Sequence, residues 1–250
     1  MTHFQDHFSE RAAGYAAHRP TYPATLAAFL AEAAPRRARA WEAGCGSGQL
    51  SLILGDRFER VIATDPSAAQ LAHARPHRNV RYVRAAAEAS GLALGIADLV
   101  VAAQAAHWFD LTAYYAEARR VGRPDAVVAL VTYGRVTVAE AVDPVIRRFY
   151  TQDLGPYWPP ARRHVDQAYR SLPFPFEPLA APELEMRADW ALADVIGYVE
   201  TWSAVRALHQ ARGDAPFAAF RRALALAWGA ATPRRSVRWP LTLRVGRVGR

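Results

Sequence analysis

The chain has 250 residues, of which 52% are hydrophobic, so it can hold one large α/β domain with a cap and is too apolar for general disorder. No stretch offers about 18 uninterrupted apolar residues, the first residues lack the apolar block of a signal peptide, and a single cysteine excludes an internal disulfide. These features predict a cytoplasmic protein that makes no membrane contact.

The net charge of +8 comes from arginine alone, because all 31 basic residues are Arg. They are scattered along the chain, and alanine is abundant, which indicates the coding bias of a GC-rich genome. The densest group, residues 234–250, overlies an alternation of apolar residues that predicts a half-buried strand with a basic outer face. This weighs against a nucleic-acid groove, whereas anionic small substrates would gain from the positive field.

Strands and helices alternate from residue 36 to about residue 135, as expected for a parallel sheet with helices on both faces. The predicted strands are 38–43, 59–65, 79–84, 97–103 and 126–133. The predicted helices are 47–57, 67–74, 87–92 and 111–121. Residues 120–125 predict a helix end followed by a turn.

The first predicted strand ends in Glu42 and leads into a glycine loop with the pattern E-x-G-x-G-x-G. The loop comprises Gly44, Cys45, Gly46 and Gly48. Glycine lets the backbone approach a ligand closely and adopt positive φ, and the following helix directs free N–H groups toward that ligand. The spacing differs from the dinucleotide pattern, and the acid at Glu42 would repel a phosphate but suits an ammonium group. The loop therefore predicts S-adenosylmethionine, with Cys45 as a small loop residue.

The second predicted strand ends in Asp65, followed by Pro66. An acid at this position of a Rossmann-like unit accepts hydrogen bonds from ribose hydroxyls. The alternative for the whole loop is a tight turn between strand and helix that binds no ligand.

The fourth predicted strand is followed by Gln104, His107 and Trp108. Because open α/β sheets bind ligands beyond the carboxyl ends of their strands, these residues share an edge with Glu42 and Asp65. His107 is the candidate catalytic residue, as a base or as a donor that orients the acceptor, and Trp108 would exclude water. The alternative for His107 is a structural residue that hydrogen-bonds the backbone. We expect Gln104 to place its backbone near the methionine part of the cofactor.

After residue 138 the pattern changes, and residues 138–180 predict a lid over the ligand crevice. A helix over 143–153 is followed by a segment rich in proline and aromatic residues. Residues 181–250 then predict a strand at 184–190, helices at 192–209 and 215–228, and a closing strand at 237–245. The candidate acceptor contacts are aromatic: Trp108, Tyr157, Trp158, Tyr198 and Trp202. Plain packing is the alternative for each. No metal site is predicted.

Three stretches resemble the class I S-adenosylmethionine-dependent methyltransferases, in particular the small-molecule branch that includes trans-aconitate and cantharidin methyltransferases. They are residues 8–23, residues 42–48 together with 65–67, and residues 104–110. The resemblance implies one domain with a Rossmann-like, seven-stranded, mostly parallel sheet, an N-terminal helical segment over residues 1–35, a cofactor-binding core over 36–135 and a cap inserted after strand five.

The resemblance also implies that the N-terminal segment closes over the cofactor, with Arg19 on its carboxylate and Tyr15 beside the methyl group. Ala87 and Glu88 occupy the stretch that contacts adenine in relatives. Many relatives have an acid just before it, where this chain has Ala86, so adenine would be held by the Ala87 backbone N–H and apolar packing.

The sequence thus predicts methyl transfer by in-line displacement to oxygen or nitrogen of a small molecule, with S-adenosyl-L-homocysteine as the second product. A carboxylate is the first candidate acceptor, and an aromatic or heterocyclic O–H or N–H is the second. The alternatives are an RNA or protein methyltransferase and a cofactor-binding module without turnover.

Overall fold

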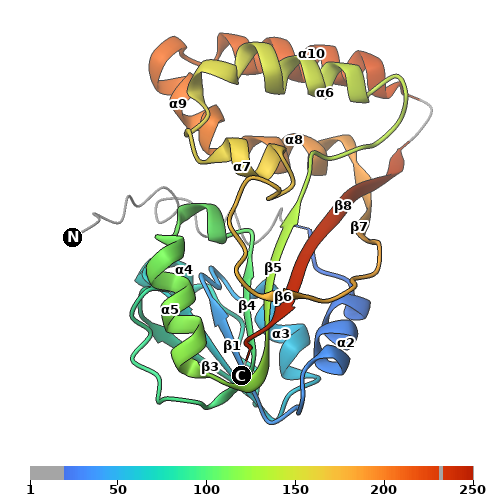
Figure 1. Ribbon diagram of the computed structural model, residues 1–250. Coiled ribbons are helices and arrows are strands. Elements are labelled where there is room, and N and C mark those ends of the chain that lie inside the picture. Colours follow the sequence, from blue (N-terminus) through green and yellow to red (C-terminus); the bar gives the residue numbers. More distant parts are fainter. Residues whose placement is uncertain (1–19, 231–232, 250) are drawn as a thin grey trace.

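The computed structural model describes residues 20–230 and 233–249; Tyr15 and Arg19 lie outside them. In this part of the chain, eight strands form one mixed sheet, whose arrangement Figure 1 shows. The strands are β1 (Arg39–Ala43), β2 (Arg60–Asp65), β3 (Val80–Arg84), β4 (Ala97–Ala103), β5 (Gly122–Tyr133), β6 (Glu177–Pro178), β7 (Leu184–Ala191) and β8 (Arg234–Arg247). The α-helices are α2 (Ala24–Ala33), α3 (Gln49–Gly55), α4 (Ala68–Ala72), α5 (Leu111–Val121), α6 (Asp143–Arg148), α7 (Arg162–Asp166), α8 (Leu192–Glu200), α9 (Ser203–Arg212) and α10 (Ala215–Trp228).

The sheet has the order β3-β2-β1-β4-β5-β8-β6, with β7 paired to β8 beside this path. The first five strands are parallel, and β8 runs antiparallel to β5. The chain crosses from one side of β1 to the other when it passes from β3 to β4, so the carboxyl ends of β1 and β4 flank the point where the strand order reverses. Ligands of open α/β sheets bind at this point.

The central strands are buried on both faces, which explains their nearly continuous apolar sequence. In β4, Leu99 and Val101 belong to one hydrophobic cluster, and Val100 and Ala102 to the other. Helices α2 and α3 cover the first face and α5 covers the second (Figure 1). The alternation places Glu42 on the α3 side of β1 and its neighbour Trp41 on the α5 side.

A cap of helices α6 to α10 stands beyond the carboxyl end of β5 (Figure 1). It includes a π-helical turn, η3 (Phe149–Asp153), and a short 3-10 helix, η4 (Gly155–Tyr157). The rings of Phe149 and Phe220 stack with centroids 4.2 Å apart, which joins the segment after β5 to α10. Within the described part of the chain, no helix has both the length and the apolar character needed to cross a bilayer.

The predicted Rossmann-like class is confirmed, with eight strands instead of seven because the two-residue β6 adds to the edge. The predicted turn over residues 120–125 is wrong, because β5 begins at Gly122 directly after α5. The turn-forming residues instead make a bulge: the pairing register shifts between Ala97 and Leu99, and Asp125 has φ of +68°.

Two predicted helices differ from the structure. The segment 87–92 is not helical. The backbone N–H of Ser90, within this segment, donates to the Glu117 carboxylate of α5. The helix predicted over 192–209 is divided into α8 and α9 by a break at Thr201–Trp202. Hydrophobic periodicity continues across this break, so the pattern alone does not reveal it.

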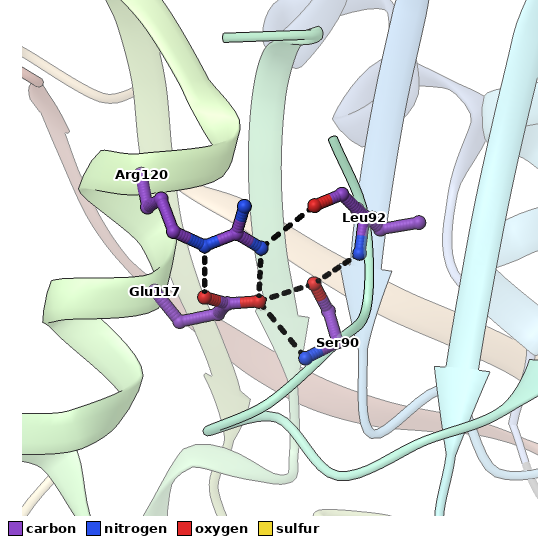
Figure 2. Close-up of polar contacts among 4 residues, drawn as sticks. All are labelled: Ser90, Leu92, Glu117 and Arg120. Atoms are coloured by element: carbon purple, nitrogen blue, oxygen red, sulfur yellow. Dashed lines mark hydrogen bonds and ion pairs between the residues drawn. The ribbon is translucent and has the colours of Figure 1, made fainter. Parts of the chain in front are cut away.

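A polar network on α5 fixes the segment that follows β3 (Figure 2). The Glu117 carboxylate accepts hydrogen bonds from the N–H and hydroxyl of Ser90 and from Arg120, which also donates to the carbonyl of Leu92. The hydrogen bonds from Arg120, followed by those from Ser90, lower the pKa of Glu117 to about 2. A loop without regular structure is thus attached to a helix of the core.

We predict that Glu117→Gln lowers the free energy of unfolding at pH 7 by about 1–3 kcal/mol, because buried donors lose a charged acceptor. The Glu117 pKa is lower in the folded protein, from an ordinary 4.5 to about 2. Its stabilisation is therefore complete above pH 4.5 and is lost as the pH falls toward 2. Urea unfolding should show the difference shrinking between pH 6 and pH 3. Glu59→Gln, on an exposed residue, is the control; an equal loss there would contradict the prediction.

Candidate functional site

The glycine loop has left-handed backbone at all three glycines, with φ of +67° at Gly44, +56° at Gly46 and +81° at Gly48. Gly48 is the N-cap residue of α3. The loop is tied to β2 because the Cys45 N–H donates to the Thr64 carbonyl over 3.0 Å. Burial raises the pKa of the Cys45 thiol, so this side chain is a small packed group and not a thiolate.

Two of the glycines are required by close packing as well as by φ. A Cβ on Gly44 would lie 2.6 Å from the Cβ of Ala105, in the segment after β4, and a Cβ on Gly48 would overlap the Tyr82 hydroxyl. A Cβ on Gly46 would meet nothing nearer than 3.7 Å. The loop is therefore pressed against the segment after β4 at Gly44 and against β3 at Gly48, while the space beside Gly46 stays open.

Asp65 at the end of β2 fixes the loop from the side. Its two carboxylate oxygens accept hydrogen bonds of 2.8 Å each, one from the backbone N–H of Gly46 and one from that of Ser67. Asp65 therefore joins the glycine loop to the segment after β2.

Glu42 is 2% exposed and lies beneath the start of α3. Its carboxylate accepts a hydrogen bond of 2.5 Å from the Ser51 hydroxyl. Burial, with a smaller contribution from the charge of Asp65, raises the pKa of Glu42 to about 8, although the Ser51 hydrogen bond opposes the shift. A buried acid in this state would be stabilised as a carboxylate by a cation, such as the ammonium group of an amino acid.

Gln104 ends β4 in a left-handed conformation, with φ of +56°. Its side chain is turned toward β5, where its carbonyl accepts from the Thr132 hydroxyl over 2.6 Å and its amide donates to the Tyr133 carbonyl over 3.3 Å. The side chain is thus occupied by structural contacts. Only the backbone around Gln104 is available to face a ligand at the carboxyl edge.

His107 lies in a short 3-10 helix, η2 (Ala106–Trp108), and its Nδ1 is 2.7 Å from the hydroxyl of Tyr169. Burial lowers the pKa of His107 to about 3, with further contributions from the charges of Arg162 and His164. The imidazole is therefore neutral near pH 7 and is a weak base. Burial also raises the pKa of Tyr169, which keeps its proton.

Tyr169 is a site residue that the sequence analysis missed. Tyr169 and its neighbour Ala168 both have positive φ, +57° and +52°, which is unusual for residues other than glycine. Arg244 of β8 holds this backbone by donating to the carbonyls of Tyr169 and Leu172. Nothing in the local sequence marks this pair, and the arginine that contacts its backbone lies 75 residues away in the chain.

The predicted acceptor residues divide into a buried group and a half-buried group. Tyr198 and Trp202 are 3% and 6% exposed, and they pack with Tyr150 and Trp158 in an aromatic cluster of these four residues. Tyr157 and Trp158 are half-buried, and Trp108 is 38% exposed beside the ring of His107. The last three are the ones with surface left for an acceptor.

Three predicted cofactor residues have structural contacts of their own. Ala87 is 3% exposed and belongs to the hydrophobic cluster on the face of the sheet that α5 covers. Glu88 accepts from the Asp110 N–H over 3.0 Å, and the Pro66 carbonyl accepts from Arg84 over 3.1 Å. The loop after β3 is thereby held at both Glu88 and Ser90, next to the start of α5.

Comparisons with known proteins agree on one family. A family model described as a methyltransferase domain matches residues 41–130. The chain is 32% identical to an inferred methyltransferase of Dictyostelium discoideum, over 84% of this chain and 81% of that protein. It is 26% identical to an inferred S-adenosylmethionine-dependent methyltransferase of Saccharomyces cerevisiae, over 59% of this chain and 55% of the other. A solved structure described as a type II methyltransferase from Anaeromyxobacter dehalogenans is 48% identical, with a TM-score of 0.86 and coverage of 92% of this chain and 98% of that one.

We predict that Gly44→Ala destabilises the protein more than Gly46→Ala. Both alanines would occupy left-handed backbone, at a cost of about 1–2 kcal/mol each. Only the alanine at position 44 would also collide with Ala105, which adds about 1–3 kcal/mol of overpacking. Urea unfolding of the two variants measures the difference, and equal losses would show that the loop yields at Gly44.

Proposed function

The chain belongs to the class I S-adenosylmethionine-dependent methyltransferases, and we propose that its acceptor is a small molecule, methylated on oxygen or nitrogen. A carboxylate is our first choice of acceptor. The observation that carries the proposal is the meeting of Glu42, the glycine loop and Asp65 with the His107–Tyr169 pair at one edge of the sheet. We also propose the small-molecule branch, on the resemblance in residues 8–23 and 104–110.

The residues at this edge suit S-adenosylmethionine. Glu42 would meet the ammonium group of its amino acid end, and Asp65 would accept from the ribose hydroxyls. Gly46, which has room beside it, would allow the ligand to approach the loop backbone. When bound, the cofactor supplies a methyl group on a positively charged sulfur, a leaving group that needs no protonation. The chain therefore has to place the acceptor in line with that methyl group and exclude water.

His107 suits the orienting role better than the role of a base. A pKa of about 3 leaves the ring with little affinity for a proton at neutral pH. The Tyr169 hydroxyl lies 2.7 Å from Nδ1 of His107, and the Thr132 side chain and the His107 backbone also lie beside this hydroxyl. We propose that the Tyr169 hydroxyl donates to Nδ1, which makes Nε2 the nitrogen that carries the ring proton.

An imidazole that presents Nε2–H donates a hydrogen bond to its neighbour. A carboxylate acceptor can take this hydrogen bond on one oxygen and attack the methyl group with the other, and it has no proton to lose. A hydroxyl acceptor would need a base stronger than His107. The tautomer set by Tyr169 thus supports a carboxylate as the first candidate.

We predict that the affinity for S-adenosylmethionine increases about tenfold from pH 6 to pH 7, because Glu42, with a pKa near 8, must lose its proton to meet the ammonium group. Titration calorimetry in buffers of different ionisation enthalpy should also show proton release on binding. In Glu42→Gln, binding should be weaker and this pH dependence should be absent.

The same calorimetry tests the proposed function itself. No binding of either S-adenosylmethionine or S-adenosylhomocysteine at millimolar concentration would end it. A pH dependence that persists in Glu42→Gln would instead remove only the role of Glu42 and leave the rest standing.

We predict that Tyr169→Phe reduces kcat/KM for a carboxylate acceptor about 10- to 100-fold, equivalent to about 1.4–2.7 kcal/mol of transition-state stabilisation, while cofactor affinity is unchanged. The variant frees the imidazole to adopt the other tautomer, in which Nε2 no longer donates. The control is Tyr115→Phe, which likewise removes one tyrosine hydroxyl. The Tyr115 hydroxyl donates to a backbone carbonyl. Full activity in Tyr169→Phe would show that the Tyr169 hydroxyl does not set the tautomer of His107.

A further inference from the structure

Arg162 brings a positive charge to the half-buried part of the aromatic cluster. Its side chain is 22% exposed, and its guanidinium lies 5.0 Å from the ring centre of Trp158. It belongs to α7, which packs against η2, the element that carries His107. Arg162 therefore lies between the candidate acceptor residues of the cap and the histidine at the sheet edge.

The contacts of Arg162 occupy one side of its guanidinium. Nε donates to the Tyr150 hydroxyl over 2.8 Å and is 3.7 Å from the Asp166 carboxylate. The Tyr150 hydroxyl donates in turn to Asp166 over 2.5 Å. Among the described residues, no hydrogen bond is made by the two terminal nitrogens of Arg162, and its shortest contact with Asp166 is at Nε. The side chain is held at Nε, and the pair of donors that suits a carboxylate remains available.

Asp166 does not complete this site. It is 43% exposed, does not hydrogen-bond the guanidinium, and receives its close contact from Tyr150. A structural ion pair would more often engage the terminal nitrogens in a two-pronged arrangement. The arrangement here fixes the position of the arginine and leaves most of its hydrogen-bonding capacity unused.

A second arginine reaches the same tyrosine from the core. Arg135 follows the carboxyl end of β5, and its guanidinium lies 5.4 Å from the ring centre of Tyr150. Arg162 lies 5.6 Å from that centre. Two positive charges thus gather around Tyr150 at the edge where the acceptor is expected, whereas the arginines of the chain are otherwise scattered.

We propose that Arg162 binds a carboxylate group of the acceptor through its terminal nitrogens and so selects organic acids with a flat apolar body. The body would lie against Trp158, and Arg135 would add to the positive field. The inference rests on the proposed function and gives it a substrate class. It also gives a role to a half-buried arginine beside a neutral histidine, because the positive charge would bind the ligand.

The test uses the full chain saturated with S-adenosylhomocysteine and three pairs of ligands in which the carboxylates of the acid are replaced by neutral amides of similar shape. The pairs are phenylacetate and phenylacetamide, cinnamate and cinnamamide, and succinate and succinamide. Calorimetry gives the acid-to-amide ratio of affinities for the wild type, Arg162→Gln, Arg162→Lys and Arg163→Gln. Arg163 is the matched control, because it is the next residue of α7 and is exposed.

We expect at least one acid to bind the wild type about tenfold or more tightly than its amide. The preference should vanish in Arg162→Gln, return in part in Arg162→Lys, and persist in Arg163→Gln. A ratio compares two ligands on one protein, so a general loss of stability would not mimic this result. The proposal is overturned if no acid of the panel is preferred, or if the preference survives Arg162→Gln. Failure of S-adenosylhomocysteine to bind any of the proteins would instead count against the proposed function.

Discussion

The two hydrogen bonds that the Asp65 carboxylate accepts from Gly46 and Ser67 decide the geometry of the ligand edge. They join the loop after β1 to the loop after β2, so two connections that could move separately become one rigid surface. Charge-assisted hydrogen bonds of this length are among the stronger ones in proteins. The packing of Gly44 against Ala105 then adds the segment after β4, and with it the position of His107.

Most of the sheet was predictable because strand and loop residues of this kind of unit follow local rules. The apolar runs, the glycine loop and the terminal Asp65 each carry their own signal, and the predicted strand 97–103 agrees with β4 in both bounds. The errors lie where distant contacts override local preference. Residues 87–92 lose their helix to Glu117, and the turn residues before Asp125 are drawn into a bulge of β5.

The site was predictable in part, for the same reason. The residues at strand ends stand out in sequence, whereas Tyr169 and Arg162 come from a segment whose pattern predicts little more than a lid. Their positions depend on Arg244 in β8 and on Tyr150 in η3, far away along the chain. A buried aromatic residue can be predicted from composition, but the direction of its hydroxyl cannot. The role we propose for His107 depends on that direction and on the burial of its ring.

Strand β8 connects the core sheet with the region beneath the cap. Its residues 234–241 pair with β7 beneath the cap, its residues 241–247 pair with β5 in the core sheet, and Leu241 pairs with both. A backbone shared in this way has no flexible joint between the parts, so their unfolding is coupled into one cooperative transition. It also means that a cap from a relative could not be exchanged as a cassette after β5 alone. A successful chimera would have to carry its own closing strand.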